Sequence, residues 1–362
     1  MRRAIELSRD ALGRTAPNPM VGCVVLDADG VEAGAGAHRG AGTRHAETIA
    51  LASAGARATG GTAVVTLEPC RHTGRTGPCT DALLGAGIAR VVYAVPDPDP
   101  VAAGGAAVLR AAGVEVVGGL LREEAERANE MWLTAVRHRR PFVTWKFAST
   151  LDGRTAAADG SSRWITAREA RRDGHALRAE HDAVLVGTGT LRADDPDLGL
   201  RHGVVGRPPL RVVLDASGRV LSSEHRVLRG PARTLVATAA DLPVPSLPHR
   251  AEALPTPRAN GRLDLGALLG LLYERDVRGL LVEGGATVAA GFVAAGLVDR
   301  VVAYLAPALL GAGREVLAPV GVTGIGEAVR LRIDSVAMVG DDVRLEMRPR
   351  GGRGRGEETG DG

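Results

Sequence analysis

The feature that most constrains this chain is an alternation of apolar strands and amphipathic helices that stops once and then starts again. Strand-like runs such as Thr62–Leu67 alternate with helical segments until the basic stretch Arg137–Arg140 interrupts the pattern. Pro141 then restarts it in an extended segment, because the residue before a proline is biased away from the helical conformation. Strands that alternate with helices favour a mostly parallel sheet covered by helices. The sequence therefore predicts two α/β domains, at 1–140 and 141–349.

The expected elements follow from the hydrophobic periodicity. In the first domain we expect helices at 2–12, 45–54, 80–84, 104–111 and 120–138, and strands at 21–27, 62–67, 90–94 and 114–117. In the second domain we expect strands at 142–148, 183–187, 210–215, 234–237, 279–283, 300–305, 329–336 and 343–347, and helices at 167–179, 265–274 and 286–295. The Pro-rich piece 241–257 has the composition of a surface loop, and 350–362 that of a disordered tail.

Composition excludes several classes of protein. The chain has 362 residues, three cysteines and a formal charge of +3, which indicates neither a disulfide framework nor a strongly basic nucleic-acid surface. No apolar run approaches the ~18 residues that cross a bilayer, and the N-terminus lacks the apolar core of a signal peptide. We therefore expect a cytoplasmic protein that acts on a small molecule, with neither a nucleic acid nor a membrane as partner.

Four residues of the first domain form the strongest chemical signal: His45, Glu47, Cys70 and Cys79. One imidazole and two thiolates are suitable ligands for Zn²⁺, and three protein ligands leave the fourth tetrahedral position to water, as in catalytic zinc sites. Glu47, which is not a ligand in this arrangement, would take a proton from that water and deliver it to the leaving ammonia. The order of these residues predicts a zinc-dependent deaminase.

The spacing of the two cysteines differs from the general pattern of nucleobase deaminases. Eight residues separate Cys70 from Cys79, where that pattern has two. Each of the four residues also has a purely structural alternative when taken singly: a histidine at the start of a helix, two small core cysteines and a solvated glutamate. The third cysteine, Cys23, lies in an apolar strand and is expected to be a buried, inert thiol.

Three motifs together carry a resemblance to a known family. The segments APNPMVGCVV, HAE and TLEPCRHTGRTGPC resemble the pyrimidine deaminase half of the bifunctional riboflavin-biosynthesis deaminase-reductases, which have this longer loop between the cysteines. The resemblance implies a cytidine-deaminase-like α/β/α domain. It also implies that Asn18 binds the pyrimidine ring and that His38, His72 and Arg75 are pocket residues, with Arg75 placed to meet a phosphate or another polar substituent. Exposed loop residues are the alternative for these last three.

The second domain contains no GxGxxG motif after a strand, so a Rossmann site is not indicated. Instead, the stretch Val282–Gly285 leads a strand through two glycines into a helix N-terminus, which suits a pyrophosphate. The segments WKFASTLDGR, SSRWIT and VGTGTLRADDPDL resemble the reductase half of the same family. The resemblance implies a dihydrofolate-reductase-like α/β domain that uses NADPH.

The same resemblance assigns the remaining site residues. The cofactor positions are Ala148, Trp164, Thr190, Asp194, Gly285 and Gly291. The substrate positions are Ser162, Arg178, Leu198, Arg201 and Glu283, and the two arginines suit a 5′-phosphate. Lys146 is the one lysine of the chain, and we expect it to act in catalysis with Glu283; a surface lysine on a strand is the alternative.

Two positions depart from the family pattern. The usual Ala-Ser-Leu-Asp-Gly reads Ser149-Thr150-Leu151-Asp152-Gly153 here, which keeps a hydroxyl group. Ala216 stands where a serine is expected after the strand that ends at Asp215, so a cofactor contact is weakened. In addition, the expectation that the cofactor is NADPH and not NADH rests on the resemblance alone, because the spacing of residues assigns no arginine to a 2′-phosphate.

We therefore predict a bifunctional enzyme with Zn²⁺ and NADPH as cofactors, which we expect to form a homo-oligomer. It would deaminate 2,5-diamino-6-(5-phosphoribosylamino)pyrimidin-4(3H)-one and then reduce the ribosyl group to ribityl, giving 5-amino-6-(5-phosphoribitylamino)uracil. One alternative is a nucleic-acid adenosine or cytidine deaminase, which leaves the second domain unexplained. Another is a nucleotide-binding regulator whose reductase half has lost catalysis.

Overall fold

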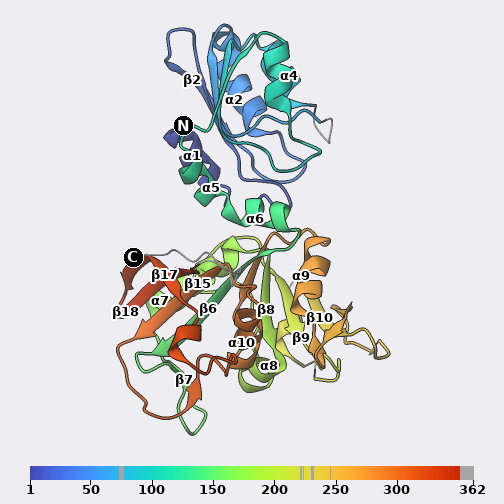
Figure 1. Cartoon of the computed structure of the whole chain (residues 1–362), viewed down its shortest axis with the longest axis vertical. Helices are drawn as coiled ribbons and strands as arrows, with labels where there is room; N and C mark the ends of the chain where they lie inside the picture. The colour runs from blue at the N-terminus through green and yellow to red at the C-terminus, as the bar shows by residue number, and fades with distance from the viewer. Residues whose placement is uncertain (73–76, 221, 223, 230–231, 245, 351–362) are drawn as a thin grey trace, which may run out of the picture. The chain divides into compact units, whose positions relative to one another are not determined.

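The computed structural model describes residues 1–72, 77–220, 222, 224–229, 232–244 and 246–350. The chain divides into two compact units (Figure 1). Unit 1 comprises Met1–Pro141 with Tyr273–Arg278, and unit 2 comprises Phe142–Leu272 with the described residues from Gly279 on. Both units are mixed α/β, which confirms the predicted fold class. Within the described residues, no helix has the length and apolar character that crossing a membrane requires.

Unit 1 is built on a five-stranded sheet with the order β2-β1-β3-β4-β5. Its strands are β1 Gly22–Leu26, β2 Glu32–Ala37, β3 Thr62–Leu67, β4 Arg90–Val95 and β5 Glu115–Gly118. Its helices are α1 Arg2–Arg9, α2 Ala46–Ala54, α3 Cys79–Gly85, α4 Gly105–Ala111, α5 Arg122–Ala128 and α6 Glu130–His138, with a 3₁₀ turn at Gly55–Ala58. β1 pairs antiparallel with β2 and β3, whereas β3, β4 and β5 are parallel. β2, β3, β4 and β5 therefore run in one direction and β1 runs against them, so the prediction of a mostly parallel sheet holds except at β1.

Strand β2 was not predicted, because its sequence EAGAGA has no β-branched or aromatic residue and so a low strand propensity. Small residues are required there by the close packing of helix α2. A Cβ atom on Gly34 would lie 2.4 Å from the carbonyl oxygen of Ala50, and one on Gly36 would lie 2.6 Å from that of Ala46. Tertiary packing, and not local propensity, decides the structure of this segment.

The single long helix predicted at 120–138 is two helices, α5 and α6, which meet at Asn129. Asn129 has φ −115° and ψ 22°, outside the helical range, and its buried side chain accepts a hydrogen bond from the backbone N–H of Met20 at 3.1 Å. The Trp132 indole donates to the carbonyl of Pro17 at 3.1 Å. The break in the helix thus ties down the loop that contains Asn18.

Unit 2 is built on a nine-stranded sheet with the order β11-β10-β9-β8-β14-β6-β15-β18-β17. Its strands are β6 Phe142–Thr150, β8 Ala183–Gly187, β9 Leu210–Leu214, β10 Thr234–Ala239, β11 Ala251–Thr256, β14 Gly279–Val282, β15 Arg300–Ala306, β17 Leu331–Val339 and β18 Asp342–Pro349. Its helices are α7 Arg168–Glu180, α8 Thr188–Asp194, α9 Leu265–Tyr273 and α10 Ala286–Ala294, with 3₁₀ turns at Arg226–Leu228 and Ile325–Glu327. Two small ribbons pair β7 Arg154–Ala156 with β16 Arg314–Glu315, and β12 Arg258–Ala259 with β13 Arg262–Leu263.

In the order of the sheet, the seven strands β11, β10, β9, β8, β14, β6 and β15 are all parallel. β18 pairs antiparallel with β15, and β17 pairs antiparallel with β18 at the edge. The central strands β8 and β14 are buried along their whole length, as their continuous apolar sequences AVLVG and GLLV require. In parallel sheets of this kind, ligands bind outside the carboxyl ends of the strands. The second site is therefore expected at the segments that follow β6, β8, β9 and β14.

Unit 2 differs from the sequence prediction at two further segments, and the predicted tail falls almost entirely outside the described residues. The predicted loop 241–257 contains strand β11, which pairs with β10 at the edge of the sheet, where Pro255 is tolerated. Helix α8 was not predicted, because the glycine and threonine residues at its start have low helix propensity. The predicted disordered tail, 350–362, lies outside the described residues except for Arg350.

A fully buried histidine gives unit 2 a testable pH dependence. Nδ1 of His181 lies 2.6 Å from the carbonyl of Leu177, and Nε2 lies 2.9 Å from the Thr144 hydroxyl. Burial lowers the pKa of His181 to about 3. The unfolded chain binds a proton at about pH 6.5 but the folded protein does not, so stability falls as the pH drops from about 6.5 towards 3.

We expect His181→Gln to remove this part of the pH dependence of stability. Between pH 6.5 and pH 5 the free energy of unfolding of the parent should fall by about 2 kcal/mol more than that of the variant, because one proton is taken up only on unfolding. Urea unfolding at the two pH values measures the difference. The exposed His249→Gln should behave like the parent. An unaltered pH dependence in His181→Gln would contradict the assignment.

Candidate active sites

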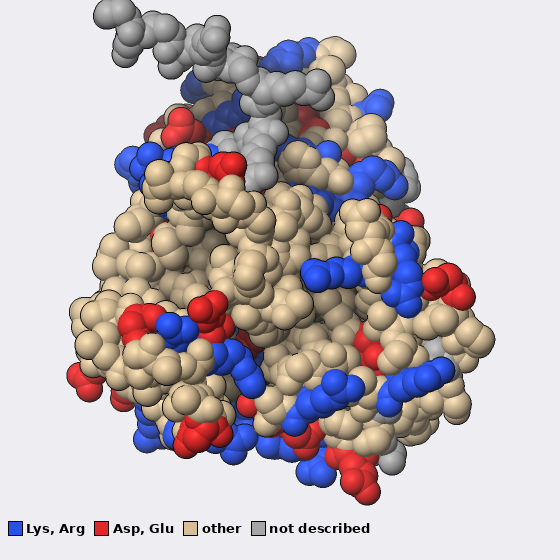
Figure 2. All heavy atoms as spheres, turned by 60° about the horizontal axis from the view of Figure 1, so that its bottom comes forward, with Lys and Arg blue, Asp and Glu red and all other residues tan. Residues whose placement is uncertain are grey.

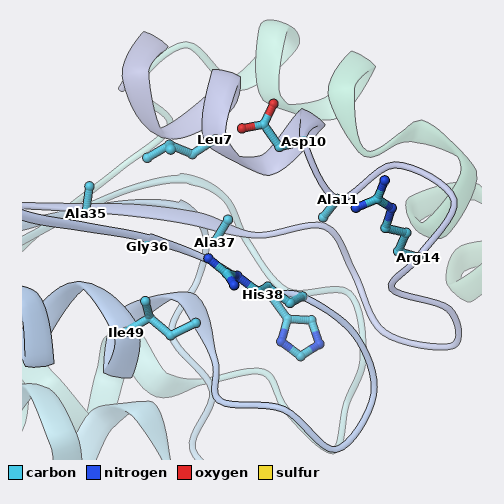
Figure 3. Close-up of a pocket in the computed structure, with 10 residues that line it drawn as sticks. Leu7, Asp10, Ala11, Arg14, Ala35, Gly36, Ala37, His38 and Ile49 are labelled. Atoms are coloured by element: carbon cyan, nitrogen blue, oxygen red, sulfur yellow. The ribbon is translucent and has the colours of Figure 1, made fainter.

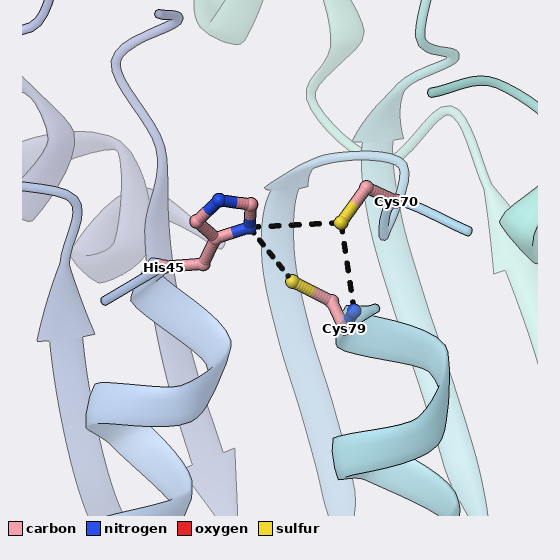
Figure 4. A group of neighbouring side chains, drawn as sticks. All are labelled: His45, Cys70 and Cys79. Atoms are coloured by element: carbon pink, nitrogen blue, oxygen red, sulfur yellow. Dashed lines mark hydrogen bonds between the residues drawn. The ribbon is translucent and has the colours of Figure 1, made fainter. Parts of the chain in front are cut away.

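Three metal-ligating side chains converge in unit 1 from three different elements (Figure 4). His45 caps the N-terminus of α2, Cys70 follows β3, and Cys79 is the first residue of α3. Nδ1 of His45 lies 3.1 Å from Sγ of Cys79 and 3.6 Å from Sγ of Cys70. The backbone N–H of Cys79 points at Sγ of Cys70 at 3.5 Å. The structure thus brings together the three residues that the sequence singled out as ligands.

The donor set fits Zn²⁺. One imidazole nitrogen and two sulfur atoms lie within 4.8 Å of one another, as expected for corners of one tetrahedron. Hydrogen bonds from Cys79 and His45 lower the pKa of the Cys70 thiol, and the same contact between the two cysteines raises the pKa of Cys79. Both side chains would bind Zn²⁺ as thiolates. By contrast, Cys23 is fully buried in β1, and burial raises the pKa of its thiol.

Glu47 lies in the first turn of α2, two residues after His45. Its side chain is buried, and burial raises the pKa of the carboxyl group. It lines the same cavity of about 180 Å³ as His45 and Cys70. The helix therefore presents a carboxyl group beside the candidate metal ligands.

The wall of this cavity includes Asn18, His38 and His72, all of which the sequence singled out. Nδ1 of the buried His38 lies 3.2 Å from the carbonyl of Arg44, so Nδ1 carries the hydrogen. Nε2 then accepts a hydrogen bond from the side-chain amide of Asn18 at 3.1 Å. Burial lowers the pKa of His38, which keeps the ring neutral. The predicted residue Arg75 lies outside the described residues.

Sequence reasoning missed several residues of the same cavity, among them Glu68, Asp97 and Asp99. Asp97 and Asp99 follow β4 in the segment Asp-Pro-Asp-Pro, at the carboxyl end of a parallel strand, and that position was the available signal. Burial raises the pKa of Asp97 to about 7. Glu68 accepts hydrogen bonds from the backbone N–H groups of Asp97 and Ala106, which fixes its carboxylate.

A second cavity of unit 1, of about 390 Å³, lies on the side of α1 (Figure 3). Leu7, Asp10 and Arg14 line it together with β2, and the ring of His38 points away from Leu7 and Asp10. The imidazole ring of His38 therefore does not point towards these residues of the cavity. Among the described residues, no group of three metal-ligating side chains lies there.

In unit 2 a buried carboxylate at the carboxyl end of β14 joins two cations, one of them in the middle of β6. Arg178 of α7 donates to both carboxylate oxygens of Glu283, at 2.6 and 2.9 Å, and to the carbonyl of Gly199 at 3.0 Å. Nζ of Lys146 in β6 lies 3.8 Å from Glu283. Burial acts to raise the pKa of Glu283, but Arg178 and Lys146 outweigh it and bring the value to about 2. Glu283 is therefore ionised at neutral pH.

The other predicted substrate residues of the reductase half have different surroundings. Arg201 is exposed, and its backbone N–H donates to Nδ1 of His175 at 3.1 Å. Burial, followed by the charge of Arg178, lowers the pKa of His175 to about 3, so its ring is neutral. Leu198 is buried and Ser162 is half-buried. Of the two arginines predicted for a phosphate, Arg178 is occupied by Glu283, whereas Arg201 is exposed.

The predicted cofactor residues lie on several elements. Gly285 precedes α10 and donates its backbone N–H to the Thr190 hydroxyl at 3.0 Å. The ring of Trp164 is 67% exposed, and the guanidinium of Arg171 lies over it at 4.2 Å. The structure places the remaining three as follows: Ala148 in β6, Asp194 at the end of α8, and Gly291 in α10.

Sequence reasoning also missed the support beneath Lys146. The ring of the buried Tyr304 lies 5.6 Å from Nζ of Lys146, and its hydroxyl donates to Asp173 at 2.5 Å. Arg344 pairs with the same carboxylate at 2.9 Å. These residues come from α7, β15 and β18, so no local sequence pattern relates them to Lys146.

Comparison with known proteins identifies the family. Residues 1–95 match the cytidine and deoxycytidylate deaminase zinc-binding region, and residues 141–345 match the RibD C-terminal domain. The riboflavin biosynthesis protein RibD of Escherichia coli (strain K12) is 40% identical, with 96% of this chain and 98% of that protein covered. The chain belongs to the RibD family. RibD of Mycobacterium tuberculosis is 43% identical over 95% of each chain.

Solved structures of the RibD family agree with this assignment. A crystal form of Acinetobacter baumannii RibD has a TM-score of 0.87 and 38% identity, covering 97% of this chain and 98% of that one. A Thermotoga maritima protein described as a diaminohydroxyphosphoribosylaminopyrimidine deaminase/5-amino-6-(5-phosphoribosylamino)uracil reductase has a TM-score of 0.88 and 38% identity over 97% of each chain. The chain is thus a bifunctional deaminase and reductase of riboflavin biosynthesis, with Zn²⁺ and NADPH as its cofactors.

The family assignment decides between the alternatives left open by the sequence. A nucleic-acid deaminase would leave the second domain unexplained, whereas the RibD match covers both halves of the chain. A regulator without reductase activity does not agree with the activity of the family.

Proposed function

We propose that unit 1 hydrolyses the amino group of 2,5-diamino-6-(5-phosphoribosylamino)pyrimidin-4(3H)-one. Unit 2 would then reduce the ribosyl group of the product to ribityl, giving 5-amino-6-(5-phosphoribitylamino)uracil. The observation that carries the first step is the convergence of His45, Cys70 and Cys79 beside the buried Glu47. The description of the Thermotoga maritima relative supports both substrates. Separate assays of ammonia release and NADPH oxidation with the two substrates test this proposal.

In the deamination, His45, Cys70 and Cys79 would hold Zn²⁺, which lowers the pKa of a water molecule towards about 7. Glu47 takes a proton from the attacking water as its oxygen bonds to the ring carbon, and delivers that proton to the departing nitrogen. The carbon–nitrogen bond breaks and ammonia leaves. The neutral His38 orients the side-chain amide of Asn18, whose carbonyl oxygen is then left to accept a hydrogen bond from the pyrimidine.

Two further residues complete the proposed deaminase site. His72 lines the cavity and would contact the ring or its ribosyl group. Arg75 would bind the phosphate, as an arginine guanidinium matches the geometry of a phosphate group.

In the reduction, bound NADPH would supply the hydride that C1′ of the ring-opened, imine form of the sugar accepts. Lys146 donates a proton to the adjacent nitrogen, so the carbon–nitrogen double bond becomes a single bond. The ionised Glu283 holds the Lys146 ammonium and is itself held by Arg178. The three charged groups therefore form one preorganised unit.

Other residues would position the substrate and the cofactor in unit 2. The exposed guanidinium of Arg201 binds the 5′-phosphate, and Ser162 and Leu198 contact the substrate. The N-terminus of α10, where backbone N–H groups favour an anion, would hold the pyrophosphate of NADPH. The cofactor positions are Ala148, Trp164, Thr190, Asp194, Gly285 and Gly291.

We propose that the domain boundary lies at 140/141 and that each half folds and acts alone. The extended strand that restarts at Phe142 and the separate core of each sheet support this. A fragment of residues 1–140 should bind zinc and release ammonia, and a fragment from residue 141 on should oxidise NADPH with the deaminated substrate. Circular dichroism and the two assays measure this. If both fragments fold but act only after mixing, the two sites are not independent.

We further propose that the chain acts in the cytoplasm as a homo-oligomer. β17 is an edge strand of the sheet, and its apolar side chains Ile333, Val336 and Met338 are between 57% and 66% exposed. Apolar side chains along an exposed edge strand favour pairing with a second copy. Light scattering of the full chain measures its mass in solution.

A further inference from the structure

A cavity of about 510 Å³ lies at the carboxyl ends of β8 and β9 in unit 2. It is lined by residues of helix α8, the end of β9 and the turn after it, the β12–β13 ribbon, the start of α9, and helix α10. Gly291, one of the proposed cofactor residues, is part of its wall. The cavity is therefore contiguous with the N-terminal half of α10, at which we place the pyrophosphate of NADPH. The next part of that cofactor is the adenosine with its 2′-phosphate.

The carboxylate at the end of β9 is not presented to this cavity as an acceptor for a ribose hydroxyl. In Rossmann-type NAD sites, which this domain does not contain, an acidic residue at a comparable strand end binds the 2′-hydroxyl group. Here the buried Asp215 accepts hydrogen bonds from the Ser217 hydroxyl at 2.8 Å and from the backbone N–H of Val220 at 2.7 Å. Each carboxylate oxygen of Asp215 thus accepts a hydrogen bond from the turn that follows β9. Ala216, the next residue, offers no hydroxyl group to the ligand.

Three arginines line the same cavity: Arg192 of α8 and Arg258 and Arg262 of the β12–β13 ribbon. Arg258 is already paired, because its Nε lies 3.0 Å from a carboxylate oxygen of Asp241 and an Nη donates to the carbonyl of Gly261 at 3.0 Å. The guanidinium groups of Arg192 and Arg262 have no hydrogen bond or ion pair to any residue that the structure describes. Two uncompensated cations therefore face this cavity.

We propose that Arg192 and Arg262 bind the 2′-phosphate of NADPH and so determine the preference for NADPH over NADH. A doubly charged phosphate is matched by two guanidinium groups, which donate paired hydrogen bonds to its oxygens. The proposal rests on the use of NADPH by unit 2 and assigns the residues that read its extra phosphate. Figure 2 views the end of unit 2 at which α8 lies, and basic side chains border its hollowed centre.

The test compares cofactors that differ only in this phosphate. Isothermal titration of the full chain with NADPH, NADH, 2′,5′-ADP and 5′-AMP measures binding without any turnover. Arg192→Ala and Arg262→Ala should each weaken NADPH and 2′,5′-ADP about tenfold, since each removes a charged hydrogen-bond donor. The double variant should weaken them roughly a hundredfold. The affinities for NADH and 5′-AMP should stay unchanged, which also shows that the variants are folded.

Arg233→Ala is the matched control. Arg233 is also an exposed arginine of unit 2, but it precedes β10 at the amino end of the parallel strands. Its replacement should leave all four affinities as they are. An equal loss for NADPH and NADH, or no loss for NADPH, in the Arg192 and Arg262 variants would overturn the assignment.

Different results would contradict the proposed reduction and the proposed phosphate site. If the parent protein binds NADPH but does not oxidise it with the deaminated substrate, the reduction is wrong and the phosphate site is still measured by titration. If the parent oxidises NADPH and the variants keep full affinity, only the phosphate site is wrong.

Discussion

Replacing Glu47 by Gln should lower the rate of ammonia release by about 10²–10⁴-fold and leave about one zinc ion bound per chain. The reason is that the ligand atoms of His45, Cys70 and Cys79 stay in place, while an amide cannot take a proton from water. Metal analysis and an ammonia assay measure the two quantities on the same sample.

The controls separate the proton carrier from the metal site. Glu123→Gln changes an exposed glutamate of α5 and should alter neither zinc content nor ammonia release. Replacing His45, Cys70 and Cys79 together by Ala should remove both. Unchanged zinc content in that triple variant would show that the metal lies elsewhere, and full ammonia release by Glu47→Gln would show that another group carries the proton.

The sequence predicted most of the α/β elements, and the differences have physical causes. The strands β3 and β8 were predicted to the residue, because continuous apolar β-branched sequence and flanking turn residues leave little choice. β2 was missed because glycine and alanine carry no strand signal, and it is a strand only because α2 packs closely against it. The antiparallel pairing of β1 with β3 depends on tertiary packing, which the local hydrophobic periodicity does not reveal.

The candidate sites were predictable where chemistry is concentrated in short motifs. His45, Cys70 and Cys79 stand out in the sequence, since metal ligation restricts residue type and order. The ion pair of Arg178 with Glu283 joins residues 105 positions apart, and no motif reveals it. The same holds for Arg192 and Arg262, which meet at one cavity only because the β12–β13 ribbon lies beside α8 there.

Replacing Glu283 by Gln should lower the rate of NADPH oxidation and also destabilise unit 2. The amide keeps the shape of the side chain but leaves the buried Arg178 guanidinium without its carboxylate, and an unpaired buried charge costs about 3–5 kcal/mol. The pKa of Glu283, about 2 when folded, adds an acid dependence, because this stability is present above the unfolded value of about 4.5 and is lost as the pH falls towards 2. Urea unfolding measures the destabilisation.

Lys146→Met should give the largest loss of NADPH oxidation with little loss of stability, because the side chain is partly exposed and its pairing with Glu283 is long, at 3.8 Å. We expect the rate with the deaminated substrate to fall by about 10²–10⁴-fold, as for the loss of a general acid, while ammonia release stays normal. Lys146→Arg separates charge from proton donation, since a guanidinium keeps the cation but does not release its proton at neutral pH. If Lys146→Arg restores the parent rate, Lys146 acts through its charge alone. If Lys146→Met itself is fully active, the reducing site does not include this lysine.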